Sequence, residues 1–131
     1  MTQKLKKLGF RGYIFSRKID GNFIPQRVQN LVIKDYCQRK KLFFKLSATE
    51  YKMEHCYLML NSVLKDIKNI NGIIFYSIFM LPEENKDRDN LIIKILKKNK
   101  EIHFALEEIE IKSIKNIKDL NNILKIRKVS K

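Results

Sequence analysis

Hydrophobic positions along the chain follow two spacings. Short runs rich in β-branched and aromatic residues predict strands at 10–16, 42–47, 71–79 and 101–107. Apolar residues spaced three or four positions apart predict helices at 26–41, 54–69, 89–100 and 116–128. The turn signal Asp20-Gly21 and then Pro25 precede the first helix, and Asp87 or Asp89 is expected to cap the third. Alternation over 108–113 predicts a short fifth strand.

This order of elements predicts one α/β domain over residues 1–131. Strands that alternate with helices of this length are typical of a parallel sheet, because parallel strands need a long crossover connection. The crossovers are right-handed, so helices cover both sheet faces. We expect a single-domain, three-layer α/β/α fold of the Rossmann-like kind, with a mostly parallel sheet of four or five strands. A flexible basic segment at 1–8 is expected to precede it.

The net charge of +14 raises the question of a nucleic-acid partner. Lysine supplies 22 of the 28 basic residues, whereas specific recognition of phosphates and bases favours arginine. This bias favours a solvated, lysine-rich surface over a functional basic patch. Nucleic acid is therefore disfavoured as a partner.

Cysteine content and hydropathy favour a cytoplasmic location. Cys37 and Cys56 are too few for a disulfide framework, so reduced thiols are expected. The basic start of the chain lacks the apolar segment that follows it in a signal peptide. The longest apolar run, 73–81, is about half of the roughly 20 residues that a membrane helix needs. We expect a cytoplasmic protein without a membrane span.

Polar side chains gather where the predicted strands end. In open parallel sheets, ligands bind outside the carboxyl ends of the strands, and helix N-termini there suit a phosphate. We expect one site at this edge, with Glu50 as its catalytic acid or base. The predicted substrate-binding residues are Ser16, Arg17, Gln26, Gln29, Ser47, Thr49, Tyr51, Ser77 and Glu107.

Several of these residues also have a structural interpretation. Glu50 is equally suited to a structural ion pair with Arg17. Ser47 and Thr49 precede a helix, where capping is the usual task of a hydroxyl, and capping is favoured for them. His103 alternates with apolar residues inside a predicted strand, which is typical of a core histidine with its hydrogen bonds satisfied.

Sequence signatures of common cofactor sites are absent. The chain has no G-x-G-x-x-G after a strand, no G-x-x-x-x-G-K-[ST] loop, and no C-x-x-C or H-E-x-x-H motif. We therefore expect neither a metal nor a bound cofactor. Phosphate binding at a helix N-terminus stays open.

Six ordered blocks carry a resemblance to a known family. They read GYIFSR, PQRVQNLVIKDYC, LSATEY, CYLML, GIIFYSIFMLPE and HFALE, and they lie within residues 9–120. The pattern resembles the sporadic carbohydrate cluster protein family, small proteins encoded in some bacterial surface-polysaccharide gene clusters. The resemblance implies a place in surface carbohydrate biosynthesis and no particular reaction.

The order of elements is also similar, more distantly, to the serine recombinase (resolvase) catalytic domain. That family begins with a G-Y-x-R-V-S strand and carries D-R-L-x-R after a later strand. Here Phe15 stands at the first arginine, Arg17 at the nucleophilic serine and Glu83 at the last arginine, while Ser16 aligns with that serine after a one-residue shift. Strand exchange needs arginines around the phosphate, so the resemblance implies a resolvase-like fold without recombinase activity.

Three functions are open at this point. The first is a small enzyme that acts on a phosphorylated or nucleotide-linked sugar. The second is a non-catalytic partner or regulator of an enzyme in that pathway, and the third is a resolvase-like nucleic-acid-binding module without recombinase activity. A sugar-phosphate or nucleotide-sugar ligand is favoured, and formation of a homo-oligomer is open.

Overall fold

The computed structural model describes residues 8–130, and within them the elements follow the predicted order. The strands are β1 (Phe10–Ile14), β2 (Phe44–Thr49), β3 (Gly72–Phe75), β4 (Glu101–Phe104) and β5 (Ile109–Ile111). The helices are α1 (Gln26–Lys40), α2 (Leu58–Lys65), α3 (Asn85–Leu96) and α4 (Lys115–Ser130), with short 3₁₀ helices η1 (Ile67–Asn69) and η2 (Ile78–Met80). Residues 1–7 of the predicted flexible segment 1–8 lie outside the described residues.

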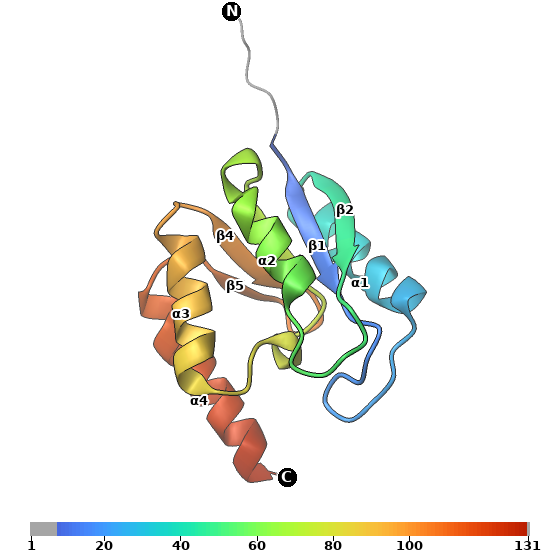
Figure 1. Ribbon diagram of the computed structural model, residues 1–131. Helices are drawn as coiled ribbons and strands as arrows, with labels where there is room; N and C mark the ends of the chain where they lie inside the picture. Colours follow the sequence, from blue (N-terminus) through green and yellow to red (C-terminus); the bar gives the residue numbers. More distant parts are fainter. Residues whose placement is uncertain (1–7, 131) are drawn as a thin grey trace, which may run out of the picture.

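The strands form one sheet in the order β2-β1-β3-β4-β5. The first four strands of the chain are parallel, and β5 pairs antiparallel with β4. Figure 1 shows α1 on one face of the sheet and α2 and α3 on the other, with α4 beside α3. The predicted three-layer, mostly parallel α/β fold is confirmed. The parallel strands place their carboxyl ends at one edge, on the side of the loops that lead into the helices.

The second helix starts later than predicted. α2 begins at Leu58 rather than at residue 54, because residues 51–57 form a loop that other parts of the chain hold in place. Ser47 and Thr49 lie inside β2, so neither caps α2, and the capping prediction for them is wrong.

The third helix starts earlier than predicted, at Asn85 rather than at residue 89. Glu84 occupies the position before the first turn, so neither Asp87 nor Asp89 caps this helix and that prediction is wrong. Asp87 lies in the first turn, where a carboxylate still interacts favourably with the helix dipole.

β3 forms the centre of the hydrophobic core, and all four of its residues are buried. A Cβ atom at Gly72, the first residue of β3, would collide with the backbone carbonyl of Glu101 on β4. Only glycine therefore permits β3 and β4 to start side by side. Large side chains from both sheet faces pack around β3, including Tyr13, Ile33 and Phe104, which are fully buried.

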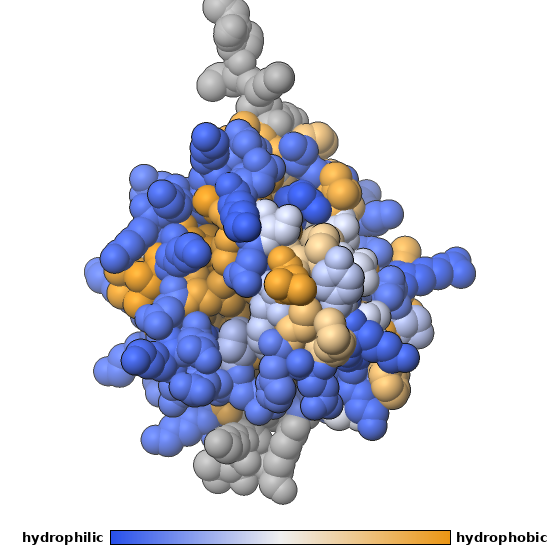
Figure 2. All heavy atoms as spheres, in the orientation of Figure 1, coloured by the Kyte–Doolittle hydropathy of each residue, from blue (hydrophilic) through white to orange (hydrophobic). Residues whose placement is uncertain are grey.

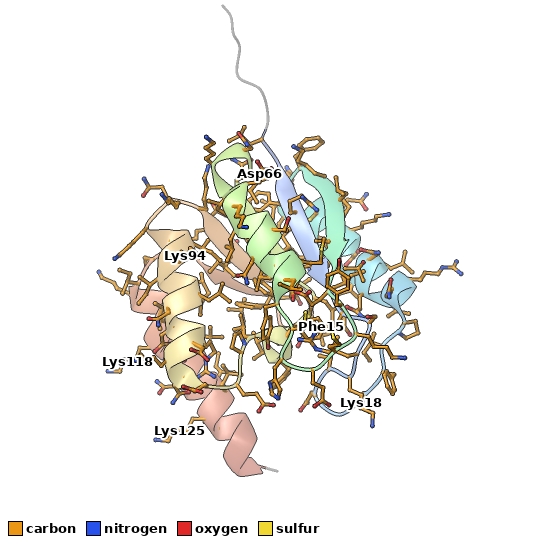
Figure 3. All side chains as sticks on the ribbon, viewed as in Figure 1. Phe15, Lys18, Asp66, Lys94, Lys118 and Lys125 are labelled. Atoms are coloured by element: carbon orange, nitrogen blue, oxygen red, sulfur yellow. The ribbon has the colours of Figure 1, made fainter. Side chains whose placement is uncertain are left out.

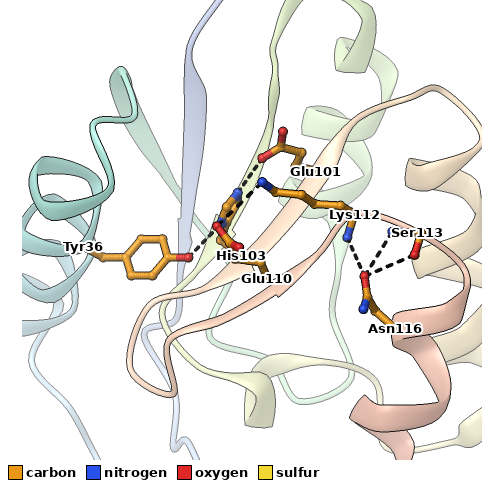
Figure 4. Close-up of polar contacts among 7 residues, drawn as sticks. All are labelled: Tyr36, Glu101, His103, Glu110, Lys112, Ser113 and Asn116. Carbon is orange, nitrogen blue, oxygen red and sulfur yellow. Dashed lines mark hydrogen bonds and ion pairs between the residues drawn. The ribbon is translucent and has the colours of Figure 1, made fainter.

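A buried polar network joins α1 to β4 (Figure 4). The Tyr36 hydroxyl lies 2.7 Å from His103 Nδ1, and His103 Nε2 lies 2.8 Å from a Glu101 carboxylate oxygen. Burial raises the pKa of Tyr36, so its hydroxyl keeps its proton and donates to Nδ1, and Nε2–H donates to Glu101. The prediction that His103 is a satisfied core histidine is confirmed.

The face shown in Figure 2 is mainly hydrophilic, with hydrophobic surface gathered around α2 and between α2 and α3. Tyr51, Met53 and Leu58 are among the large hydrophobic side chains that are more than half exposed. Within residues 8–130, no helix combines the length and apolar character that crossing a membrane would require.

We predict that His103 makes stability fall as the solution is acidified. Burial lowers the pKa of His103, although Glu101 partly offsets this. Below the ordinary histidine pKa of 6.5 the unfolded chain therefore binds a proton that the folded protein does not. The free energy of unfolding should decline by up to about 1.4 kcal/mol per pH unit from there down to the folded-state pKa.

Urea unfolding of the wild type, His103→Gln and His55→Gln across this pH range measures the effect. His103→Gln should flatten the decline, and His55→Gln, which alters an exposed histidine, should retain it. Equal slopes in all three proteins would contradict the assignment.

Candidate functional site

Glu50 lies where β2 ends, and only 2% of its surface is exposed. Its carboxylate accepts hydrogen bonds from the Tyr13 hydroxyl (2.6 Å) and from the backbone amides of Tyr51 (3.0 Å), Met59 (3.0 Å) and Leu60 (3.1 Å). Met59 and Leu60 belong to the first turn of α2. Glu50 therefore caps this helix from a distant position in the chain and ties it to β1.

The protonation of Glu50 follows from these contacts. Burial by itself would raise the pKa of Glu50, but the Tyr13 hydroxyl and the three amides outweigh it and hold the pKa below its ordinary value. Burial and the Glu50 carboxylate raise the pKa of Tyr13, so Tyr13 remains the proton donor of this pair. The contacts give Glu50 a structural task, and its catalytic role stays a prediction.

Arg17 holds the loop between β2 and α2. Its Nη1 atom donates to the backbone carbonyls of Tyr51, Met53 and Cys56, each at 3.0 Å. The guanidinium carbon lies 3.9 Å from the centre of the Phe15 ring, a cation–π contact. Arg17 and Glu50 form no ion pair, and each is instead neutralised in part by backbone dipoles of the same loop.

The segment after β1 is fixed by two other predicted site residues. The fully buried Gln29 accepts a hydrogen bond from the Phe15 amide (2.9 Å) and donates to the carbonyls of Phe15 and Ile24 (both 2.8 Å). In this way its amide group acts as a strand partner for Phe15. The Ser16 hydroxyl donates to the Glu50 carbonyl at 3.2 Å.

Ser77 and Glu107 form a second cluster at the carboxyl edge. The Ser77 hydroxyl donates to Glu107 (2.7 Å), the Ile78 amide donates to the same carboxylate (2.9 Å), and the Phe79 amide donates to Ser77 Oγ (3.2 Å). Burial raises the pKa of Glu107, the donors partly offset this, and nearby Asp20 adds to the rise. The pair caps η2.

The remaining predicted residues are spread over the β2 side of the molecule. The Ser47 hydroxyl donates to Asn30 on α1 at 2.6 Å, which links β2 to that helix. Gln26 is exposed at the start of α1, and Thr49 is exposed at the end of β2. Tyr51 is 52% exposed.

A cavity of about 540 Å³ opens at the carboxyl edge, and we call it the carboxyl-edge groove. It lies between the segment after β1, the 51–57 loop and the residues after η2. Its lining residues are Phe15, Arg17, Lys18, Phe23, Lys52, Glu54, His55, Tyr57, Phe79, Leu81 and Glu83. In Figure 3, Phe15 lies within the fold just beyond the end of β1, and Lys18 projects from the outer loop.

The groove combines basic side chains with aromatic rings. Arg17, Lys18 and Lys52 supply positive charge, and Glu54 and Glu83 supply two carboxylates. The Lys18 ammonium lies 5.4 Å from the centre of the Phe23 ring, and Phe23 is 65% exposed. Such a lining suits an anionic ligand that also presents a flat ring for stacking.

Arg17 is the residue of the predicted set that lines the groove, whereas Glu50 and Glu107 lie outside it. Lys18 and Lys52 each directly follow a predicted site residue. Their position just after a strand end could therefore have predicted them as site residues. The rings of Phe23, Tyr57 and Phe79 come from three separate segments, and no local pattern in the sequence marks them as neighbours.

Metal-binding clusters of three or more His, Cys, Asp or Glu side chains do not occur within residues 8–130. Cys37 and Cys56 are both free thiols, and burial raises the pKa of Cys37 to about 11. The groove itself is lined by charged side chains, aromatic rings and hydrogen-bonding groups.

Two solved structures share this fold. A resolvase family site-specific recombinase from Streptococcus pneumoniae superposes with a TM-score of 0.66 at 12% sequence identity, covering 92% of this chain and 89% of that chain. The fold is resolvase-like. The N-terminal catalytic domain of TP901-1 integrase superposes with a TM-score of 0.62 at 16% identity, covering 92% of this chain and 98% of that chain.

Identities this low establish the resolvase-like fold and leave function to the site itself. The chain matches no protein-family model and no curated protein sequence. Its resemblance to the sporadic carbohydrate cluster family is therefore not supported by these comparisons.

We predict that Glu50→Gln destabilises the protein by about 3 kcal/mol, because a single amide oxygen cannot serve four donors and buried amides lose their acceptor. Urea unfolding at neutral pH measures the loss. Glu54→Gln, an exposed change in the same loop, should alter stability by less than about 0.5 kcal/mol. If Glu50→Gln were as stable as Glu54→Gln, Glu50 would not be the capping group inferred here.

Proposed function

We propose that this protein binds a phosphate-bearing ligand in the carboxyl-edge groove, and that the ligand is a nucleotide-linked sugar. The observation that carries the proposal is the meeting of three cations with four aromatic rings in one cavity of about 540 Å³. Cavities of this size are typical for ligands of a few hundred daltons, on the order of 300–1,000 Å³.

Each part of such a ligand has a matching group in the groove. Lys18 and Lys52 suit the phosphates, because an ammonium is a compact positive charge with three hydrogen-bond donors. The exposed ring of Phe23 suits stacking against a base. Glu54 and Glu83 suit sugar hydroxyls, which donate hydrogen bonds to carboxylates.

We take the context, surface carbohydrate biosynthesis, from the resemblance carried by the six sequence blocks quoted above, which the comparisons do not support. A sugar as the second half of the ligand follows from that context. On this proposal the protein is cytoplasmic, where nucleotide-linked sugars are made. If it is an enzyme, the groove requires an acid or base that reaches the ligand. His55, Glu54 and Glu83 line the groove and are better placed for this than Glu50, whose carboxylate is occupied by its donors.

A non-catalytic partner of a pathway enzyme is the alternative in the same context. It is supported by the hydrophobic side chains of Tyr51, Met53 and Leu58, which are 52%, 63% and 60% exposed on the segment that leads into α2. An exposed hydrophobic group of this kind is typical of protein-interaction surfaces. Self-association of the chain stays a prediction.

Nucleic-acid binding is the third candidate, supported by the resolvase-like fold and the charge of +14. Recombinase chemistry is not part of it. The Ser16 hydroxyl bonds to the Glu50 carbonyl, Arg17 is engaged by three carbonyls, and Glu83 adds negative charge to the groove. A phosphodiester undergoing transfer would meet one arginine there, whereas its developing charge calls for several.

We predict that calorimetric titration with a panel of uridine-, guanosine- and cytidine-linked sugars and simple sugar phosphates finds binding by at least one nucleotide-linked sugar. Lys52→Ala and Phe23→Ala should each weaken that binding about three- to tenfold, since each removes one charge or stacking contact. Lys118→Ala, an exposed lysine on α4, is the matched control and should bind as the wild type does.

Two results would count against the proposal. One is no binding across the panel, and the other is wild-type affinity in both groove variants. Binding to duplex DNA that survives physiological salt would favour the nucleic-acid-binding candidate, because non-specific electrostatic binding weakens steeply as salt rises.

A further inference from the structure

A second cavity of about 500 Å³ adjoins the carboxyl-edge groove, and we call it the Arg88 cavity. It shares Lys18, Phe79, Leu81 and Glu83 with the groove and extends below η2 towards α4. Its other lining residues are Asp20, Gly21, Ile78, Pro82, Arg88 and Leu124. Arg88 distinguishes it, because only 6% of this charged side chain is exposed.

The partners of Arg88 are all neutral oxygens. Its Nε and Nη2 atoms donate to the Asn121 side chain on α4 (3.2 and 3.1 Å), Nη2 also donates to the Asn85 side chain, and Nη1 donates to the Glu83 carbonyl (3.2 Å). Nη1 carries two N–H groups. Among the described backbone atoms and the side chains of residues 8–126, the Glu83 carbonyl is the one acceptor that it meets, so one N–H has no partner among them.

Arg88 forms no ion pair with the described residues. The carboxylate of the adjacent Asp89 attracts it at longer range and accepts a hydrogen bond from Asn121. Glu83 lines the same cavity but is exposed, so water screens its carboxylate. Asp20 also lines the cavity and has an interaction of its own within the protein. Burial lowers the pKa of Arg88, and the nearby Asp89 carboxylate offsets this only in part.

A buried cation that contacts no counter-ion is costly to the fold, and a cavity at its side gives an anion access to it. Lys18, exposed at the shared rim, can approach such an anion from the solvent side. We propose that the Arg88 cavity binds an oxyanion of the phosphate class, held by the free N–H of Arg88 and by the ammonium of Lys18.

The site is open to two sources of phosphate. One is free inorganic phosphate, which needs no other part of the molecule. The other is a phosphate group of the ligand proposed above, since Lys18 lies in both cavities, and this assignment rests on that proposed function. The experiment below uses inorganic phosphate as its probe, so that the two proposals can fail separately.

Inorganic phosphate titrated into the full chain, at constant ionic strength set with chloride, tests the site by calorimetry and by the midpoint of thermal unfolding. The wild type should bind phosphate and unfold at a higher temperature as phosphate is added. Lys18→Ala should weaken phosphate binding about tenfold and leave the phosphate-free midpoint unchanged. Lys94→Ala, which removes an exposed lysine on α3, should retain wild-type affinity.

Arg88→Gln separates this proposal from a purely structural role in joining α3 to α4. Arg88→Gln should lower the phosphate-free midpoint under either role. It should also abolish the rise of the midpoint with phosphate only if Arg88 binds phosphate. Lys18→Ala keeps the test decisive if Arg88→Gln does not fold, because Lys18 is exposed. The proposal is overturned if the wild type shows no phosphate-specific rise, or if Lys18→Ala binds phosphate as tightly as the wild type.

The outcomes also distinguish the two proposals. Phosphate binding without any nucleotide-sugar binding keeps the Arg88 site and removes the function proposed for the groove. Nucleotide-sugar binding without phosphate binding keeps the groove and removes the Arg88 site.

Discussion

The hydrogen bonds to the Glu50 carboxylate hold together three segments that are far apart in the sequence. Tyr13 on β1 donates through its hydroxyl, and Tyr51 in the loop after β2 donates through its backbone amide. The first turn of α2 donates through two backbone amides. The charge stays on Glu50 because these donors outweigh the effect of burial on its pKa. A neutral or shorter side chain would leave the start of α2 without its acceptor.

Arg17, a positively charged residue, holds the same loop through its carbonyl groups. Glu50 accepts hydrogen bonds from the first amide of the 51–57 loop and from the first turn of α2, which follows it. Arg17 donates to the carbonyls of Tyr51, Met53 and Cys56 within the loop. The loop is thus fixed by two charged groups that do not pair with each other. Because it supplies Lys52, Glu54, His55 and Tyr57 to the carboxyl-edge groove, the groove is pre-organised before a ligand arrives. Its cations and rings, rather than the shared resolvase-like fold, carry the proposed function.

The sequence predicted the fold well, because the spacing of apolar residues reports directly on strands, helices and the parallel sheet. It also predicted ten site residues at one edge. Hydrogen bonds join four of them, Ser16, Arg17, Glu50 and Tyr51, but of the ten only Arg17 lines the groove, and their role in binding stays a prediction. It did not predict that Glu50 caps α2, because a capping group distant from its helix leaves no local pattern. Arg88 was missed for a related reason: its burial depends on how α4 packs, and its partner Asn121 is remote in the sequence.

On the function proposed above, the carboxyl edge is a pre-organised binding groove for a phosphate-bearing ligand. The most direct measurement is a map of backbone amide NMR shifts, recorded while UDP-glucose or the tightest-binding nucleotide sugar is added. We predict that the shifted amides cluster at residues 15–23, 51–57 and 79–83, while those of β5 and the start of α4 stay unchanged. Shifts centred on any other face, or no saturable shifts at all, would contradict it.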